Sequence, residues 1–403
     1  MPDLSLADFL AADEVVVRSA RRTPMLPAHW LEDAVGGPIL MKAENLQRSG
    51  SFKIRGAAVR LARLSAAERA DGVVAASAGN HAQGVALAAA DLGIPATVFM
   101  PRTASLPKIA ATRTYGAEVQ LVGETLADAF AAAAEFVQTT GSTMIHPFDH
   151  RDIVLGQGSV GLEIAADVPE AATVVVPAGG GGLLAGVAAA LHAAGSAAAV
   201  VGVQAAGCAP LGPSLAAGHP VPWGRTPATM ADGIAVAEPG QLPVALATSL
   251  VDRVVQVSEE EISEGVLQTL ERAKLLAEPA GVVGISAVIA DPEAFPPPVV
   301  VVVSGGNIDP LLLNRILSHG LAVAGRYVAL TVRIPDQPGQ LAALLDTVAH
   351  TEVNVLDINH VRSDPRLAVG EVEIMIRCET RGPDHRAAAV AHVKAAGYPV
   401  STS

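Results

Sequence analysis

A lysine stands among small residues in the segment 49–57, directly after Phe52. A lysine amine can form a Schiff base with a carbonyl compound, so Lys53 is a candidate for covalent catalysis. Most charged side chains are solvated and take no part in chemistry, and by itself Lys53 has the character of an ordinary surface lysine. A catalytic role for Lys53 therefore requires other chemical groups that would lie beside it.

Residues 179–182 are four consecutive glycines between an apolar strand at 173–177 and a helix that begins near Leu183. Bare backbone N–H groups at a helix N-terminus can surround an anion, so this loop predicts a phosphate site rather than a turn without a ligand. No lysine follows in the Walker position, which argues against a nucleoside-triphosphate loop. The next strand ends in Gln204 and not in an acidic residue, so a phosphate monoester is favoured over a dinucleotide.

Three further polar or glycine-rich segments lie where short apolar strands are expected to end, at 77–84, 231–234 and 304–307. The first could bind a substrate carboxylate or merely cap a helix, and the last could equally be a turn. In open α/β sheets ligands bind at the carboxyl ends of strands, so these loops and the glycine loop should converge. A lysine that forms a Schiff base and a phosphate loop together favour pyridoxal phosphate as the cofactor.

Strands and helices alternate between residues 38 and 319. Short apolar or alternating runs predict strands at 38–44, 72–77, 96–101, 118–122, 173–177, 198–204, 252–257 and 298–303. Helical patterns are found at 55–64, 80–92, 107–115, 125–139, 156–166, 183–194, 258–276, 278–290 and 309–319. Glu278 could be simple negative charge at the N-terminus of the last but one of these helices. The alternation predicts an α/β fold with open parallel sheets, covered by helices on both faces.

The pattern changes after Gly325, where strands and helices follow in the order βαββαβ of the ferredoxin-like motif. We therefore expect two domains. The first is a catalytic domain at 1–325, with a small subdomain at roughly 45–150 inserted in the larger one. The second is a separate domain at 326–403.

Composition excludes several classes of protein. The chain has 403 residues and a net charge of −13, which argues against non-specific binding of nucleic acid. Cys208 and Cys378 are far apart and in no metal-type spacing, so neither a disulfide scaffold nor a zinc site is expected. The N-terminus lacks the pattern of a signal peptide, and no apolar stretch reaches the about 20 residues of a membrane helix. A soluble, cytoplasmic protein with no membrane partner is expected.

Five motifs, taken in order, resemble the threonine dehydratases, which are also called threonine ammonia-lyases. They are Lys42-x-Glu44-Asn45, residues 51–57, residues 77–84, the four glycines and residues 304–307. That family consists of fold-type II pyridoxal-phosphate enzymes with the tryptophan-synthase-β-like fold of two subdomains, and the resemblance covers essentially the whole chain. Residues 336–341 read Asp-x-Pro-Gly-x-Leu, so the C-terminal part resembles a single ACT regulatory domain. The resemblance implies a homodimer or homotetramer, with an amino-acid effector possible at the ACT-like domain.

The resemblance also implies a role for each motif residue. Lys53 would bind the cofactor covalently and move the substrate α-proton, with Phe52 beside the ring. Ser304 would face the pyridine nitrogen. The cofactor phosphate would be held by Gly179, Gly180, Gly181, Gly182 and Leu183. Asn80 would hydrogen-bond the ring hydroxyl, and the amino-acid substrate would be bound, largely through backbone N–H groups, by Ser77, Ala78, Gly79, Asn80 and His81.

The implied activity is β-elimination of the hydroxyl of L-threonine, and of L-serine, giving 2-oxobutanoate or pyruvate and ammonia. Related serine racemases carry a second serine at the position of Ala78, which cannot move a proton, so elimination is favoured over racemisation. Gln204, Cys208 and Pro210 stand where those enzymes bind a divalent cation, so no metal ligand is assigned, while a monovalent cation stays open. A β-replacement enzyme such as a cysteine synthase and a non-catalytic amino-acid sensor are the alternatives.

Overall fold

The computed structural model describes residues 4–363 and 365–402 of the chain. The chain forms two compact units, Met1–Pro310 and Leu311–Ser403. The boundary expected at residue 325 lies just after helix α14 (Pro310–Val323), whereas the contacts of the chain group nearly all of this helix with the C-terminal unit. Sequence placed the helix in the catalytic domain because it continues the strand–helix alternation of that domain.

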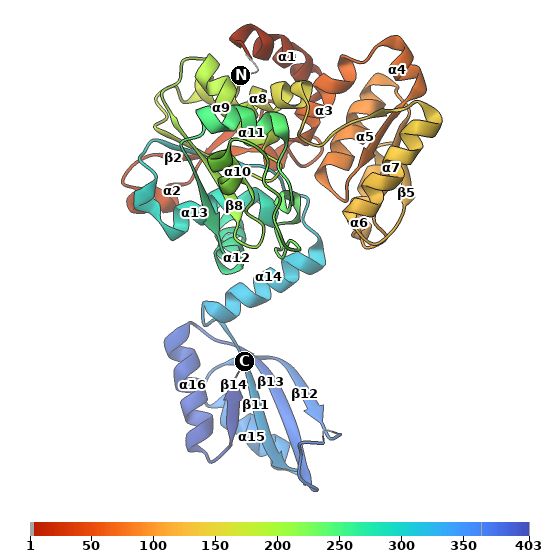
Figure 1. Ribbon diagram of the computed structural model, residues 1–403. Coiled ribbons are helices and arrows are strands. Elements are labelled where there is room, and N and C mark those ends of the chain that lie inside the picture. The colour runs from red at the N-terminus through yellow and green to blue at the C-terminus, as the bar shows by residue number, and fades with distance from the viewer. Residues whose placement is uncertain (1–3, 364, 403) are drawn as a thin grey trace. The chain divides into compact units, whose positions relative to one another are not determined.

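The N-terminal unit is built around a six-stranded sheet in the order β1-β2-β10-β7-β8-β9 (Figure 1). Its strands are β1 (Met25–Pro27), β2 (Ile39–Ala43), β10 (Val299–Val303), β7 (Thr173–Pro177), β8 (Ala199–Ala205) and β9 (Arg253–Val257). All neighbours are parallel except β1 and β2, which are antiparallel. The valines of β10 are completely buried, as expected for a central strand that helices cover on both faces.

Alternate residues of the central strands show which helices cover each face, because successive side chains point to opposite sides of a sheet. Val174 and Val302 share a core cluster with residues of α8 (Arg151–Asp167) and α9 (Gly182–Ala193). On the other face, a Cβ at Gly284 of α13 (Pro279–Ala290) would come within 2.7 Å of Val301 Cγ1. The remaining helices of this larger subdomain are α1 (Leu6–Ser19), α2 (His29–Val35), α10 (Leu211–Ala217), α11 (Gln241–Leu250) and α12 (Glu259–Gln268).

A second, smaller sheet lies in the same unit, in the order β5-β4-β3-β6, and all of its neighbours are parallel. Its strands are β5 (Glu118–Leu121), β4 (Ala96–Met100), β3 (Val73–Ala76) and β6 (Thr143–Met144). Its helices are α3 (Lys53–Ala62), α4 (Ala66–Asp71), α5 (Asn80–Leu92), α6 (Leu106–Thr114) and α7 (Leu126–Thr140). Figure 1 shows this orange-to-yellow group beside the larger sheet, which confirms the α/β fold with two parallel-sheet subdomains.

Two helices differ from the sequence prediction. Helix α8 begins at Arg151, earlier than the expected 156, and its N-cap is His150, whose side chain accepts from Asp152 N. Gly156 lies inside this helix and packs closely against Gly56 of α3. A Cβ added at Gly156 would lie 2.6 Å from the Cα of Gly56, so the contact requires glycine. The helix predicted at 258–276 ends earlier, because α12 continues into a π-helical turn, Thr269–Ala273, which is followed by a left-handed residue, Lys274.

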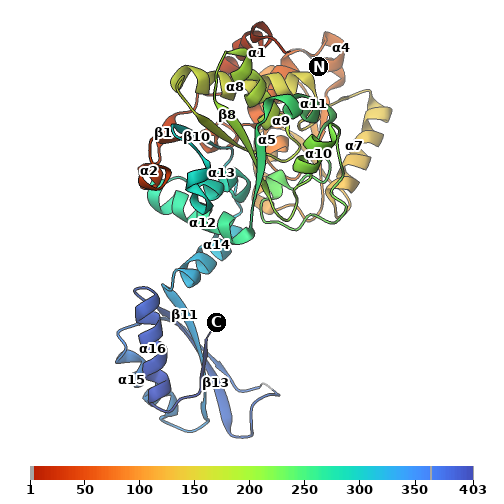
Figure 2. The ribbon, with the colours of Figure 1, turned by 60° about the vertical axis from the view of Figure 1, so that its left-hand side comes forward.

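The C-terminal unit contains a four-stranded antiparallel sheet in the order β12-β13-β11-β14. After α14 its elements are β11 (Tyr327–Pro335), α15 (Gln340–Ala349), β12 (Asn354–Val361), β13 (Glu371–Glu379), α16 (Pro383–Ala395) and β14 (Val400–Thr402). The order βαββαβ is therefore confirmed. Alternate residues of β11, such as Val328 and Leu330, are buried under α15 and α16, which lie on one face of the sheet (Figure 2).

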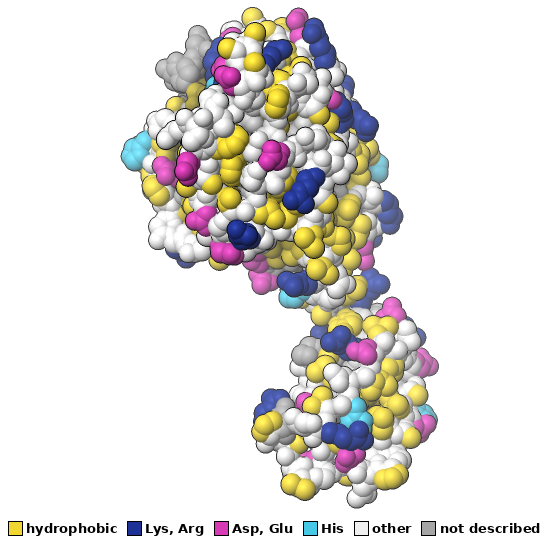
Figure 3. All heavy atoms as spheres, turned by 90° about the vertical axis from the view of Figure 1, so that its right-hand side faces the viewer, with side chains coloured by type: hydrophobic (Ala, Val, Ile, Leu, Met, Phe, Trp, Pro, Cys, Tyr) yellow, Lys and Arg dark blue, Asp and Glu magenta, His cyan; other side chains and the backbone are white. Residues whose placement is uncertain are grey.

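The surface mixes apolar and charged groups. On the face drawn in Figure 3, hydrophobic side chains are interspersed with backbone and uncharged polar groups, and acidic and basic side chains are scattered among them. This agrees with a chain of which half is hydrophobic and only 17% is charged. Within the described residues, none of the helices has both the length and the apolar character that crossing a bilayer requires.

Candidate active site

Lys53 is the first residue of α3, and the two residues before it are bonded to the segment that follows β10. Phe52 N donates to Ser304 O over 3.1 Å, and Ser51 forms an isolated β-bridge with Gly305. The lysine of the small subdomain and the serine that follows the central strand of the large one are therefore neighbours. Both line a cavity of about 660 Å³ in the N-terminal unit, a size typical of small-molecule sites.

The Lys53 amine lies in this cavity in a partly desolvated position. Nζ donates to Pro147 O over 3.0 Å and lies 5.1 Å from the centroid of the Phe52 ring. Burial lowers the pKa of Lys53 to about 8, while the Glu278 carboxylate acts in the opposite direction. A larger share of the amine is thus neutral, and therefore nucleophilic, near neutral pH than in an exposed lysine.

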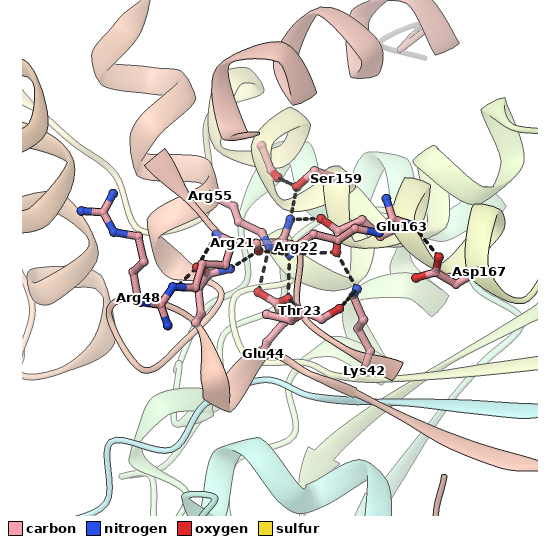
Figure 4. A network of polar contacts seen from close by, with 12 residues as sticks. Arg21, Arg22, Thr23, Lys42, Glu44, Arg48, Arg55, Ser159, Glu163 and Asp167 are labelled. Carbon is pink, nitrogen blue, oxygen red and sulfur yellow. Dashed lines mark hydrogen bonds and ion pairs between the residues drawn. The ribbon is translucent and has the colours of Figure 1, made fainter. Parts of the chain in front are cut away.

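A buried network of charges fixes the helix that begins at this lysine (Figure 4). Arg55, in the first turn of α3, donates to both oxygens of Glu44 over 2.8 Å and to both oxygens of Glu163 over 2.7 and 3.0 Å. Lys42 Nζ lies 2.5 Å from Glu163 Oε2, so two cations face two carboxylates. Arg55 and Glu44 are fully buried. Because Glu44 follows β2 and Glu163 belongs to α8, the network holds α3 against the larger subdomain.

The four glycines connect the end of β7 to the first turn of α9, as predicted. A Cβ at Gly180 would clash with the ring of Phe148, and one at Gly182 would lie 2.9 Å from Phe148 Cβ. Gly181 has a φ of +90°, which residues with a side chain rarely adopt. The packing therefore requires glycine here, and it brings bare backbone to a helix N-terminus, where the amide dipoles favour an anion such as phosphate.

The turn that includes Ser77 and Gly79 joins β3 to α5 and also lines the cavity. Gly79 N donates to Ser77 Oγ over 3.2 Å. His81 is buried, and its Nε2 lies 2.8 Å from Ile145 O. Burial lowers the pKa of His81 to about 3, so the ring is neutral at physiological pH. His81 therefore supplies no positive charge for a substrate carboxylate, and the backbone at the start of α5 is the better candidate.

Every residue with a predicted role lines this one cavity. They are Phe52, Lys53, Ser77, Ala78, Gly79, Asn80, His81, Gly179, Gly180, Gly181, Gly182, Leu183 and Ser304. The expected convergence of the loops is therefore found, while the role of each residue stays a prediction. A pyridoxal phosphate fits this set, because the glycine loop suits its phosphate and a lysine amine is present for its aldehyde.

Besides the exposed Glu238, sequence reasoning missed three charged residues that line the cavity. Lys108 of α6 and Asp232 in the short helix Asp232–Ile234 form an ion pair over 2.5 Å, which joins the two subdomains. Lys108 gives no signal in the sequence, since it resembles any helix lysine. The sequence predicts a polar loop at 231–234 but indicates no role for Asp232. The third residue is Glu278, which sequence treated as ordinary charge at a helix N-terminus.

Glu278 is instead a buried carboxyl group that faces the cavity, with 2% of its surface exposed. It accepts a hydrogen bond from Asn80 Nδ2 over 2.5 Å. Burial raises the pKa of Glu278 to about 7, and Asp232 adds to the shift, whereas Lys108, the Asn80 hydrogen bond and Lys53 oppose it. The cavity thus holds two groups, Lys53 and Glu278, that change protonation near neutral pH.

The region that binds a divalent cation in racemases contains few suitable groups. Gln204 Oε1 accepts from Leu211 N over 2.8 Å, and Cys208 Sγ lies 3.4 Å from Val236 O. In residues 4–363 and 365–402, no three His, Cys, Asp or Glu side chains are grouped so that they could hold a metal ion. No metal ligand is therefore assigned.

Comparison with known proteins agrees with this site. Residues 16–305 match the model of the family described as pyridoxal-phosphate dependent enzymes. The chain is 43% identical over 382 residues to the L-threonine ammonia-lyase of Thermotoga maritima, covering 95% of each chain. It is 42% identical over 390 residues to that of Geobacter sulfurreducens, covering 96% of this chain and 97% of that one.

Among solved structures, the processed form of threonine deaminase isoform 2 from Solanum lycopersicum has a TM-score of 0.74 and 36% sequence identity. The match covers 77% of this chain and 86% of that one. The lysine, the glycine loop and the matched sequence all lie within the N-terminal unit. The chain belongs to the family of pyridoxal-phosphate-dependent enzymes.

Proposed function

We propose that the chain is an L-threonine ammonia-lyase, which converts L-threonine to 2-oxobutanoate and ammonia and L-serine to pyruvate and ammonia. The observation that carries the proposal is the single cavity that brings together Lys53, the glycine loop and the turn at 77–81. Two relatives named L-threonine ammonia-lyase, matched over 95% and 96% of this chain, support the choice of reaction.

The residues of the cavity suit each task in this reaction. Pyridoxal phosphate supplies an electron sink for negative charge at the substrate α-carbon. The glycine loop binds the phosphate, and the backbone at the start of α5 binds the substrate carboxylate. The Lys53 amine, with its lowered pKa, takes the α-proton. Ser304 would face the pyridine nitrogen. Its hydroxyl group is neutral, so it does not force that nitrogen to be protonated as a carboxylate would.

Elimination is favoured over racemisation at this site. A racemase needs a second proton-transfer group on the opposite face of the α-carbon. Ala78 lines the cavity at the position where related racemases have a serine, and its methyl group cannot move a proton. A β-replacement reaction and a non-catalytic sensor remain the competing functions, and product analysis distinguishes them.

The test is to load the purified protein with pyridoxal phosphate and to add L-threonine or L-serine. L-threonine should release 2-oxobutanoate and ammonia in equal amounts, and L-serine should release pyruvate and ammonia in equal amounts. Formation of D-serine would favour a racemase. Products that appear only with an added nucleophile would favour a β-replacement enzyme. A loaded protein that releases no oxo acid from either amino acid would contradict the proposal.

We also infer that residues 326–403 form an ACT-type regulatory domain, with the catalytic domain at 1–325. The turn before α15 supports an effector site, because Gly339 has a φ of +91° and places bare backbone at the start of that helix. A dimerisation module without a ligand is the alternative. Two further expectations remain predictions, namely a homodimer or homotetramer and a location in the cytoplasm. Analytical ultracentrifugation tests the number of copies in the assembly.

A further inference from the structure

The side-chain amide of Asn80 is held on both sides by other side chains. Its Nδ2 donates to Glu278 Oε1 over 2.5 Å, and its Oδ1 accepts from Asn307 Nδ2 over 2.8 Å. Asn307 Nδ2 also donates to Ser49 O over 2.8 Å. The contributing residues come from the start of α5, the N-cap of α13, the loop after β10 and the segment before Lys53. Segments far apart in sequence therefore meet at one amide.

These contacts determine which way the amide of Asn80 points. A carbonyl or carboxylate oxygen only accepts, and an amide nitrogen only donates. The carbonyl of Ser49 fixes Asn307 with its nitrogen toward Asn80, and Glu278 in its ionised form requires a donor. Rotation of the Asn80 amide by half a turn would place oxygen against oxygen and nitrogen against nitrogen. Leaving these partly buried polar groups without hydrogen-bond partners is unfavourable, which disfavours the flipped state.

The surrounding backbone leaves little space for the side chains of Glu278 and Asn307 to move away from Asn80. A Cβ at Gly305 would clash with Glu278 Oε1, and one at Gly50 would clash with Asn307 Oδ1. Glu278 is 2% exposed, and burying a carboxyl group is unfavourable unless a hydrogen bond compensates. An amide nitrogen carries two hydrogens, and Glu278 accepts one of them. The second hydrogen of Asn80 Nδ2 is available to a group bound in the cavity, which Asn80 lines.

We propose that Glu278 and Asn307 are positioning residues that clamp Asn80 so that its Nδ2 presents a donor to an acceptor oxygen of the cofactor. The proposal rests on the predicted contact of Asn80 with the ring hydroxyl, and it extends that contact to two residues with no assigned role. A fixed donor binds the acceptor without the entropy loss of ordering a free side chain, so removing the clamp weakens cofactor binding.

The experiment measures cofactor binding to apo-protein in the absence of substrate. Glu278→Met removes the acceptor while keeping the side-chain length, and Glu278→Gln keeps an acceptor oxygen. We expect Glu278→Met to weaken binding of pyridoxal phosphate about 10-fold, the usual effect of one hydrogen bond, and to shift the visible absorbance of the bound cofactor. Glu278→Gln should remain within about 3-fold of the unsubstituted protein.

A double-mutant cycle separates positioning from general stability. In an Asn80→Ala background, Glu278→Met should cause no further loss of binding, because the residue through which it acts is gone. Val283→Ala is the matched control, since it weakens the same helix, α13, from a buried position outside the cavity lining. It should lower thermal stability without changing the absorbance of the bound cofactor.

Additive losses in the cycle, or a Glu278→Met protein that binds the cofactor normally, would overturn the proposal. If Glu278→Met does not fold, Asn307→Leu tests the other side of the clamp in the same cycle with the same expected outcome. Because no substrate is added, the result is independent of the reaction. A protein that shows the predicted coupling but releases no 2-oxobutanoate would contradict the proposed function alone.

Discussion

The chemistry of Lys53 depends directly on the pH. Its pKa is lowered by burial from 10.5 to about 8, so the neutral amine increases as the pH rises through about 8 and reaches a plateau above it. We expect the rate at which apo-protein attaches pyridoxal phosphate to follow this curve, because the neutral amine attacks the aldehyde. A rate that is independent of pH between about 6 and 9 would contradict the assignment.

Lys53→Ala should abolish covalent attachment and lower turnover by at least roughly 10²–10⁴-fold, the usual contribution of a catalytic acid or base. Borohydride reduction followed by peptide mass spectrometry measures the attachment. Lys394→Ala, at an exposed lysine of the C-terminal unit, is the control and should leave both quantities unchanged. Reduced cofactor found on another lysine in Lys53→Ala would transfer the role to that residue.

The glycine loop tolerates no side chain at Gly180, where a Cβ would clash with the ring of Phe148. Gly180→Ala should therefore displace the loop or the ring, at a cost of about 1–3 kcal/mol, which corresponds to a loss of cofactor affinity of roughly 5- to 150-fold. Titration of apo-protein with pyridoxal phosphate checks this. Gly212→Ala, in α10 with open space at the Cβ position, is the matched control and should bind normally.

At the scale of the element, α3 depends on the charges packed around Arg55. Arg55→Ala would leave Glu44 and Glu163 as buried carboxylates without their main partner, so it should lower the free energy of unfolding by about 3–5 kcal/mol. Urea denaturation measures the loss. Arg22→Ala removes an ion pair with Asp167 whose arginine side chain is 55% exposed, and it should cost only about 0–1 kcal/mol. Equal losses in the two variants would contradict the importance of the buried network.

Helix α6 contributes Lys108, which connects the small subdomain to the large one through Asp232. Its Nζ would lie 3.6 Å from a Cβ at Gly79, in the turn proposed to bind the substrate carboxylate. Lys108→Ala should raise the KM for L-threonine about 10- to 100-fold, equivalent to one hydrogen bond to a charged group, with a smaller effect on kcat. Arg113→Ala, at an exposed residue of the same helix, is the control. An unchanged KM in steady-state kinetics would remove Lys108 from the substrate site.

At the scale of the molecule, sequence predicts those features that are encoded locally. The valine run of β10 and the four glycines are visible in short windows, and the structure places them as expected. The sequence places the start of α8 too late, at Gly156, because a glycine lowers helix propensity and is more typical of a helix end. In the structure Gly156 lies inside the helix and allows close packing against α3. The contact between Glu278 and Asn80 cannot be predicted from the sequence, because the two residues lie far apart in it. Local patterns do not reveal contacts that exist only after both sheets have formed.

Each unit has a hydrophobic core of its own, and this leads to a prediction for the whole chain. The core of the C-terminal sheet is drawn from residues 328–400, whereas the clusters of the N-terminal unit are drawn from residues 4–302. Each core can therefore unfold independently, and calorimetry of the full chain should show two transitions. A chain that ends at residue 325 should lose one transition and retain ammonia release.

If the C-terminal unit is regulatory, isoleucine or valine should shift the activity of the full chain and leave the shortened chain unaffected. A shortened chain that still responds to these amino acids would place the effector site in the N-terminal unit, and a single shared transition would show that the two cores unfold together.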